Sequence, residues 1–397
     1  MNDEKLMSIA RQFGTPAFVF DEAELHARVA FLRENLPARA TLCFAVKANP
    51  FAIPLIRPVV HRFEVCSPGE LNICRAVGVA PEEIVLSGVY KDEATVRDLV
   101  ERDVPIHRYT VESLTQFQLL YRLAKEYGHR LPLLLRVTTG TQFGMDQAVV
   151  RQIIAEHGAD PTVEICGLQV FAGTQKKTAR RTAKELAMAD ALIADLRESY
   201  GFEVCEFEFG PGLPVEYFDD YDEAEERALL AEVSELLEGM AFQGPLTLEI
   251  GRSLVASCGS YITGVVDAKT NKGENYAIVD GGKHQMVYYG GGLVMRQPPC
   301  WQLGSRDLDA AAGNVENWNI CGSLCTTNDF LAKEVPAVDL AVGDVIAFDR
   351  TGAYCMTEGI SLFLSRDLPK VVYALADGGN KLVREGIPTD PLNTPRL

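Results

Sequence analysis

Short β-rich runs alternate with amphipathic helical patterns from about residue 40 to residue 252. Eight of these runs have the length and apolar content of buried strands, and each except the last is followed by a helical stretch. They are residues 41–47, 62–67, 84–89, 105–111, 131–139, 163–173, 204–210 and 245–251. Eight strands that alternate with helices over roughly 210 residues predict a (β/α)8 barrel, which typically needs about 250 residues. An open doubly wound sheet is the competing arrangement.

Two of the intervening segments are strongly helical. Residues 92–103 begin with Asp and Glu, which suit the positive end of a helix dipole. Residues 178–201 are rich in strong helix formers and end at Gly201, a typical C-cap residue. Such segments are the helical crossovers that parallel strands need, whether the sheet is closed or open.

The pattern changes after residue 253. Strand-like runs are now separated by Gly, Asp and Asn turns with little helical pattern between them, at residues 253–271, 275–282, 343–354 and 370–375. Residues 271–282 are typical of a hairpin. This half is therefore predicted to be mostly antiparallel β structure.

We expect two domains from these patterns. The (β/α)8 barrel is assigned to residues 23–252. A β-sandwich or β-barrel domain is assigned to residues 253–397 together with the N-terminal residues 1–22. The Pro-rich residues 387–397 are expected to form a weakly ordered tail.

Charge narrows the classes of partner. The chain has 38 Lys and Arg against 55 Asp and Glu, and its net charge of -17 repels nucleic acid and anionic membrane surfaces. The first residues include acids and no long apolar stretch, and no segment approaches about 20 uninterrupted apolar residues. We expect a cytoplasmic protein with no nucleic-acid and no membrane partner.

The ten cysteines are expected to be reduced thiols rather than a disulfide framework. Cys321 and Cys325 have three residues between them and no neighbouring His or second Cys pair, so no metal site is expected. Six others lie in apolar segments and are interpreted as small buried side chains: Cys43, Cys66, Cys74, Cys166, Cys205 and Cys258.

Lys47 stands at the end of the first predicted strand, in FAVKANP. Its side chain could extend to water where a buried strand reaches the surface. Alternatively, a lysine at the mouth of a packed sheet is a nucleophile that forms Schiff bases. The strand ends of a (β/α)8 barrel carry its active site, which favours the second interpretation.

Other strand ends are also polar. Glycines follow strands six and seven, at residues 172–175 and 210–212, where backbone N–H groups can approach an anion, although glycine also serves ordinary turns. Glu249 and Arg252 lie at the end of strand eight, as a structural pair or as functional groups. A lysine, a phosphate-binding turn and a carboxylate together fit pyridoxal 5'-phosphate (PLP), whose pyridine nitrogen the carboxylate keeps protonated.

Five motifs, in order along the chain, carry a resemblance to a known family. They are FAVKANP with Lys47, FGPG with Gly210 and Gly212, EIGR with Glu249 and Arg252, CTTND with Cys325 and Asp329, and GAY with Tyr354. Over nearly its whole length, the chain resembles the fold type III PLP-dependent decarboxylases, which act on diaminopimelate, ornithine or arginine. The resemblance implies an alanine racemase-like fold, with a PLP-binding (β/α)8 barrel and a C-terminal antiparallel β domain.

The resemblance also implies roles for single residues. Lys47 forms the Schiff base with PLP, and Cys325 protonates Cα of the substrate as general acid. Cys325 and Tyr354 reach the active site of the other subunit, because family members are head-to-tail homodimers with two shared sites. The residues implied around the cofactor are Lys47, Glu64, Arg136, Phe171, Thr174, Gly210, Gly212, Glu249, Arg252 and Tyr354. Those implied at the substrate are Thr326, Asp329 and Tyr354. As alternatives, Cys325 could be a buried thiol and Tyr354 an interface aromatic.

Two departures from the family pattern bear on the substrate. Phe171 replaces the family's histidine, so that stacking on the pyridine ring is kept while the polar contacts are lost. Thr326 follows Cys325 where the family has Asp or Glu, which binds the distal ammonium of a diamino acid. A hydroxyl does not supply that charge-assisted hydrogen bond. The motifs GTQ after strand six and QFGMD at 142–146 look closer to the branch that contains the carrier-protein-linked glutamate decarboxylase of butirosin biosynthesis.

These features predict a PLP-dependent amino-acid α-decarboxylase, a carboxy-lyase that acts on a modified or carrier-bound amino acid. A decarboxylase of diaminopimelate or of a basic amino acid is one alternative. An amino-acid racemase is another, although Arg rather than Glu249 would be expected opposite the pyridine nitrogen. A catalytically silent PLP-binding homologue is a third.

Overall fold

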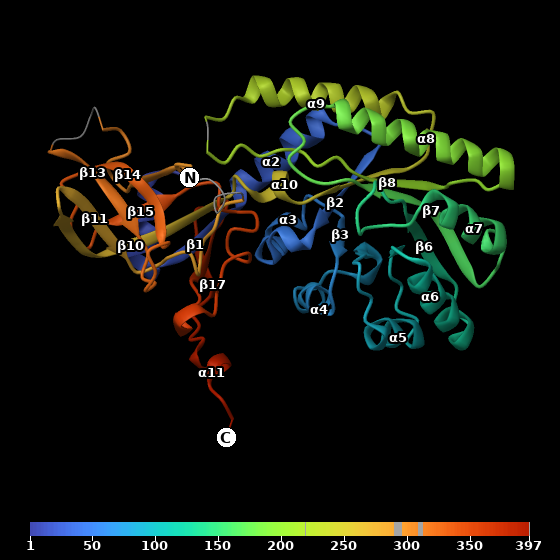
Figure 1. Cartoon of the computed structure of the whole chain (residues 1–397), viewed down its shortest axis with the longest axis horizontal. Coiled ribbons are helices and arrows are strands. Elements are labelled where there is room, and N and C mark those ends of the chain that lie inside the picture. The colour runs from blue at the N-terminus through green and yellow to red at the C-terminus, as the bar shows by residue number, and fades with distance from the viewer. Residues whose placement is uncertain (219, 290–295, 309–312, 397) are drawn as a thin grey trace. The chain divides into compact units, whose positions relative to one another are not determined.

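The computed structural model describes residues 1–218, 220–289, 296–308 and 313–396. These residues form two compact units. One contains residues 1–28, 216–221 and 255–397, and the other contains residues 29–215 and 222–254. Figure 1 shows most of the helices in the second unit and the strands β10, β11, β13, β14 and β15 in the first. The domain boundaries expected from the sequence stay a prediction.

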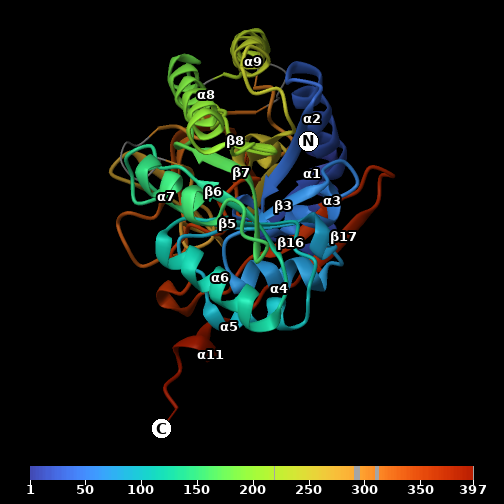
Figure 2. The same cartoon turned by 90° about the vertical axis from the view of Figure 1, so that its right-hand side faces the viewer.

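The second unit is a closed barrel of eight parallel strands, so the alternative of an open sheet is wrong. Figure 2 shows helices α2 to α9 arranged around these strands. The strands are β2 (Ala40–Ala45), β3 (Arg62–Val65), β4 (Ile84–Leu86), β5 (Arg108–Val111), β6 (Leu131–Arg136), β7 (Val163–Phe171), β8 (Glu206–Gly210) and β9 (Leu246–Ile250). All eight overlap the predicted runs, although most are shorter.

The α-helices of the barrel segment are α2 (Glu22–Asn35), α3 (Ile53–Ile56), α4 (Pro68–Ala76), α5 (Glu93–Glu101), α6 (Leu114–Tyr127), α7 (Gln147–His157), α8 (Arg180–Tyr200), α9 (Glu223–Glu238) and α10 (Arg252–Val255). Their ends follow local capping chemistry. Asp92 accepts the backbone N–H of Thr95 at the start of α5, and Gly201 ends α8 with a φ of 64°. Both strongly helical segments are thus confirmed.

Lys47 differs from its predicted position in one detail. β2 ends at Ala45, and Lys47 lies in a short 3₁₀ turn over Val46–Ala48. The side chain of Asn49 accepts the backbone N–H of Phe51 at 3.0 Å, which begins the next turn. The chain therefore turns at the barrel mouth rather than continuing outward as a strand.

The described residues of the first unit form nine strands, which pair mainly in antiparallel fashion as predicted; the pairs β1–β16 and β11–β13 are parallel. The predicted hairpin is formed by β10 and β11. The strands are β1 (Ala17–Asp21), β10 (Gly259–Asn271), β11 (Glu274–Val279), β12 (Cys300–Gln302), β13 (Val315–Cys321), β14 (Phe330–Val338), β15 (Val345–Phe348), β16 (Lys370–Ala374) and β17 (Asn380–Arg384).

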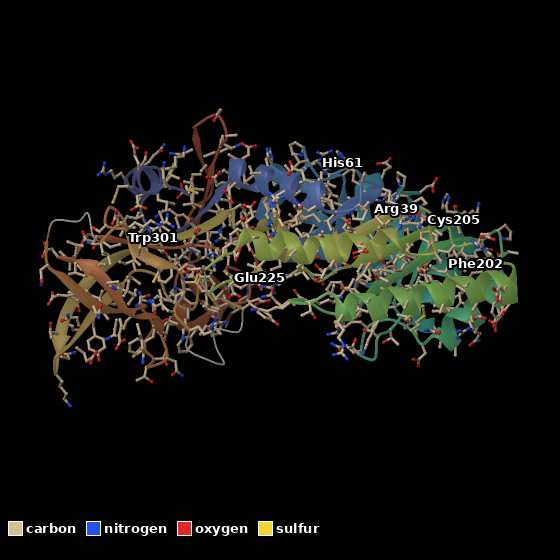
Figure 3. All side chains as sticks on the ribbon, turned by 90° about the horizontal axis from the view of Figure 1, so that it is seen from above. Arg39, His61, Phe202, Cys205, Glu225 and Trp301 are labelled. Carbon is tan, nitrogen blue, oxygen red and sulfur yellow. The ribbon has the colours of Figure 1, made fainter. Side chains whose placement is uncertain are left out.

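Helix α1 (Asp3–Phe13) packs on this sheet through Leu6 and Ile9, which are fully buried. Its first residue, Asp3, accepts Nε1–H of Trp301 at 2.9 Å. Figure 3 labels Trp301 among the strands of this unit. The N-terminal helix is therefore part of the β unit.

Two of the six cysteines expected to be buried are not. Cys205, which is labelled in Figure 3, is exposed, and Cys66 is half-buried. Both flank a strand, where the chain leaves the packed interior. In the C-terminal segment α11 (Asp390–Asn393) forms and Thr389 is buried, while its weak order stays a prediction; residue 397 lies outside the described residues. Among the described residues, no helix is long and apolar enough to cross a membrane.

Candidate active site

Lys47 lies between two buried carboxyl groups inside the barrel. Its Nζ is 2.8 Å from Oε2 of Glu64 and 3.1 Å from Oε1 of Glu249. Glu64 lies on β3 and Glu249 on β9, the two strands that flank β2. The glutamates are 1% and 4% exposed, whereas the Lys47 side chain is 37% exposed. The amino group is therefore the accessible end of a buried ionic cluster.

The two carboxyl groups titrate far apart. Burial would raise the pKa of Glu64, but the ammonium of Lys47 and hydrogen bonds with Glu249 and Lys47 outweigh burial and lower this pKa to about 2. Burial, followed by the charge of Glu64, raises the pKa of Glu249 to about 7. At neutral pH, Glu64 is an anion and Glu249 can gain or lose a proton easily. Such a pair suits a site in which one carboxyl shares a proton with a ring nitrogen.

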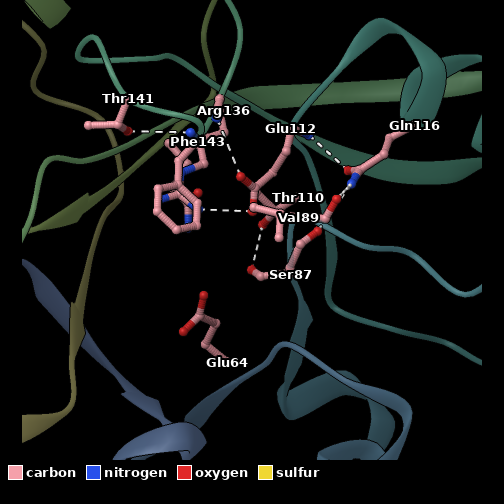
Figure 4. Close-up of polar contacts among 12 residues, drawn as sticks. Glu64, Ser87, Val89, Thr110, Glu112, Gln116, Arg136, Thr141 and Phe143 are labelled. Atoms are coloured by element: carbon pink, nitrogen blue, oxygen red, sulfur yellow. Dashed lines mark hydrogen bonds and ion pairs between the residues drawn. The ribbon is translucent and has the colours of Figure 1, made fainter.

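Arg136, the last residue of β6, is held by a second buried ion pair. Its Nη1 donates to Oε1 of Glu112 at 2.9 Å, as Figure 4 shows. The guanidinium carbon lies 4.8 Å from the ring centre of Phe143 and 5.8 Å from that of Phe171. Because Glu112 neutralises the charge of Arg136, the two aromatic rings and the guanidinium form a rigid wall without net charge.

Phe171 ends β7 and lies beside Lys47. The Nζ of Lys47 is 5.6 Å from the centre of the Phe171 ring. A side chain on Gly210, the neighbouring residue on β8, would collide with this ring. Gly210 is therefore needed for the position of Phe171, and the ring offers a flat apolar face close to the amino group.

The turns after β7 and β8 fit each other closely. Gly173 and Gly212 have φ values of 114° and 63°, which favour glycine, and a Cβ on Gly212 would collide with the carbonyl of Gly173. Thr174 is exposed in the first turn, and Arg252 is buried at the start of α10. These glycine turns lie at the carboxyl ends of adjacent strands. Together they form a cradle whose backbone N–H groups can bind a phosphate.

Two interior residues were missed from the sequence. Gln169 on β7 and Glu208 on β8 are fully buried, and Nε2 of Gln169 lies 2.6 Å from Oε1 of Glu208 and 3.3 Å from Oε2 of Glu249. Burial and the charge of Glu249 raise the pKa of Glu208 well above its usual range. Strand periodicity was the available signal, since each lies two residues before a predicted site residue on the same strand, Phe171 or Gly210.

The remaining predicted residues belong to the first unit. Cys325 and Thr326 are exposed in the loop between β13 and β14, and Tyr354 is half-buried with a φ of 65°. Asp329 is 3% exposed, and its carboxylate accepts the backbone N–H groups of Lys283 and Leu324, each at 2.8 Å. These two hydrogen bonds therefore stabilise the loop that carries Cys325. Contact of these four residues with a barrel site stays a prediction.

Comparisons with known proteins agree with this geometry. The pyridoxal binding domain of the pyridoxal-dependent decarboxylases matches residues 22–256. Diaminopimelate decarboxylase of Pseudomonas fluorescens is 30% identical over 377 residues, which cover 88% of this chain and 85% of that protein. L-glutamyl-[BtrI acyl-carrier protein] decarboxylase of Niallia circulans is 25% identical over 407 residues, covering 97% of this chain and 94% of that protein.

A solved structure shows the same fold. The crystal structure of diaminopimelate decarboxylase from M. jannaschi superposes with a TM-score of 0.85 at 22% identity, and the match covers 97% of this chain and 93% of that chain. The predicted combination of a parallel barrel with an antiparallel β unit is thus confirmed, as are the resemblance, the cofactor and the enzyme class. The chain belongs to the pyridoxal-dependent decarboxylases, the carboxy-lyases that use PLP.

Proposed function

We propose that this member of the family removes the α-carboxylate, as CO2, from an amino acid whose side chain is modified or attached to a carrier protein. The observation that carries the catalytic part is the accessible amino group of Lys47 between Glu64 and Glu249, beside a glycine cradle and an aromatic face. PLP, when bound, supplies an electron sink for the breaking of the bond to the carboxylate.

The residues of the barrel fit this cofactor by their chemistry. Lys47 would hold PLP through its amino group, and Glu249 would hold the proton of the pyridine nitrogen, which its pKa of about 7 favours. Phe171 would pack on the ring, and Glu64 and Arg136 would complete the walls. The residues proposed at the phosphate are Thr174, Gly210, Gly212, Arg252 and Tyr354.

Cys325 is proposed to deliver the proton to Cα after CO2 leaves. It is exposed in its own unit, which suits a group that completes a site in another subunit. Tyr354 is proposed to enter the same site, so the active form would be a homodimer with shared sites. The ten free thiols of the chain fit a reducing compartment, and we propose that the enzyme works in the cytoplasm.

Thr326 supports the substrate class. A neutral hydroxyl at this exposed position offers no countercharge to a distal ammonium, whereas it can hydrogen-bond the amide or thioester carbonyl of a modified side chain. The relative from Niallia circulans is named for a glutamyl group on an acyl-carrier protein, which has such a carbonyl. Diaminopimelate remains the second candidate, because the relative from Pseudomonas fluorescens is named for it.

A screen for CO2 release separates the two candidates. The holoenzyme is assayed with meso-diaminopimelate, lysine, ornithine, free glutamate, side-chain-acylated amino acids and glutamate linked to an acyl-carrier protein. We expect release from an acylated or carrier-linked substrate. Release from free diaminopimelate or lysine at a higher kcat/KM would overturn the inference from Thr326.

A further inference from the structure

Lys176 is a buried lysine at the barrel mouth, and none of the roles proposed above uses it. It follows β7 in the same turn as Thr174, and its side chain is 4% exposed. Nζ of Lys176 lies 2.5 Å from Oε2 of Glu185 on α8 and 3.4 Å from the carbonyl oxygen of Gly210. Burial lowers the pKa of Lys176, while Glu185 acts in the opposite direction. Its ammonium thus lies against the first glycine of the proposed phosphate cradle.

The backbone of Lys176 belongs to the same cradle. Its N–H donates to the carbonyl of Gly212 at 2.9 Å, and a Cβ on Gly212 would lie 3.1 Å from Cε of Lys176. The neighbouring side chain of Gln175 joins the two turns a second time, because its amide donates to the carbonyl of Val215 at 3.0 Å and accepts the Val215 N–H at 2.7 Å. Residues 173–176 and 210–215 are therefore one preassembled structure.

The charges around this structure do not cancel. Glu185 pairs with Lys176 and, at 3.1 Å, with Nε of Arg181, so two cations share one anion. A methyl group on Gly173 would lie 3.9 Å from Nη1 of Arg181, which places this second cation near the other turn. Replacing a buried ion pair by apolar side chains is often neutral or stabilising, so stability alone does not explain a buried lysine here. Two cations that share one carboxylate beside a glycine cradle instead suit a phosphate dianion.

We propose that Lys176 is a positioning residue for the phosphate end of the cofactor, where it fixes the turn at Gly210–Gly212 and supplies positive charge beneath it. The inference rests on the proposed function, in which this cradle receives the phosphate of PLP. Lys47 would still bind the aldehyde, so the two lysines act on opposite ends of the same molecule. The consequence is specific, because loss of Lys176 should weaken the binding only of ligands that carry the phosphate.

The test compares PLP with pyridoxal, which has the same ring and aldehyde but no phosphate. Apoenzyme is titrated with each compound, and the dissociation constant is measured from the absorbance of the lysine-bound chromophore. We expect Lys176→Met to raise the dissociation constant of PLP by about ten- to a hundred-fold, which is the usual range for a lost interaction with a charged group. The dissociation constant of pyridoxal should rise by less than about twofold. Lys177→Met is the matched control, since it removes the next, exposed lysine of the same turn and should change neither constant.

A second variant keeps the test informative if Lys176→Met does not fold. Glu185→Gln removes the shared anion, while the amide oxygen of Gln can still accept a hydrogen bond from Lys176. This variant should therefore strengthen the binding of PLP relative to the binding of pyridoxal. An equal loss of affinity for both compounds in Lys176→Met would overturn the role of Lys176. So would an unchanged ratio of the two dissociation constants in both variants. If wild-type apoenzyme takes up neither compound, the proposed use of Lys47 fails instead.

Discussion

Replacing Lys47 by Met should destabilise the cofactor-free protein in a pH-dependent way. The change keeps the length of the side chain but leaves Glu64 and Glu249, at 1% and 4% exposure, without the ammonium between them. The pKa of Glu64 is about 2 in the folded protein, against an ordinary value of 4.5. The ammonium of Lys47 therefore stabilises the Glu64 anion, and removing one partner of such a buried ion pair costs about 3 kcal/mol or more at neutral pH.

The pH window follows from the sign of the shift. A lowered carboxyl pKa stabilises the folded state above the unfolded pKa of 4.5 and loses that effect as the pH falls toward 2. The difference in unfolding free energy between wild type and Lys47→Met should therefore be about 3 kcal/mol at pH 7 and less than half of that near pH 3.

Urea unfolding of the two apoproteins at several pH values measures this difference. The double variant Lys47→Met/Glu64→Gln is the control, because it removes the unpaired anion together with its partner and should recover most of the lost stability. A Lys47→Met protein that is as stable as wild type at pH 7, or a loss that is the same at pH 7 and pH 3, would refute the ionic cluster as described.

Further variants test the β unit. Cys325→Ala should retain bound PLP, seen by absorbance, but reduce kcat at least tenfold through loss of the proposed proton donor; unchanged turnover would remove Cys325 from the mechanism. Thr326→Asp should raise kcat/KM for lysine or diaminopimelate relative to wild type, because it supplies the missing countercharge, and no gain would mean that this position does not face the distal group. Asp329→Asn should lower the free energy of unfolding by about 1–3 kcal/mol, since the carboxylate accepts the N–H groups of Lys283 and Leu324, whereas unchanged urea unfolding would deny it that role.

The sequence was most informative where burial dictates its pattern. All eight barrel strands were predicted, because strands covered on both faces must be nearly continuous apolar runs. For the β unit, the sequence predicted mostly antiparallel β structure but not which strands pair. Its pairing of β1 with both β10 and β16 joins segments hundreds of residues apart, and no local pattern encodes such partners.

The site shows the same limit on a smaller scale. Lys47 and Glu249 could be found because each stands out at a strand end. Gln169 and Glu208 were missed although strand periodicity places them on the same faces as Phe171 and Gly210, because the partners of a polar residue within an apolar strand become evident only when the barrel is closed. The exposure of Cys205 was missed for a related reason, since it precedes β8 by a single residue and strand boundaries are the least certain part of a sequence pattern.

The attachment point of PLP tests the central claim most directly. Holoenzyme is reduced with borohydride, which fixes the link between PLP and a lysine, and the modified peptide is identified by mass spectrometry. The structure offers a choice, because Lys91 and Lys176 are buried lysines that also follow barrel strands, β4 and β7. We predict a single modified residue, Lys47, and no modification in Lys47→Ala. Attachment to Lys91 or Lys176, or no attachment at all, would contradict the assignment of Lys47.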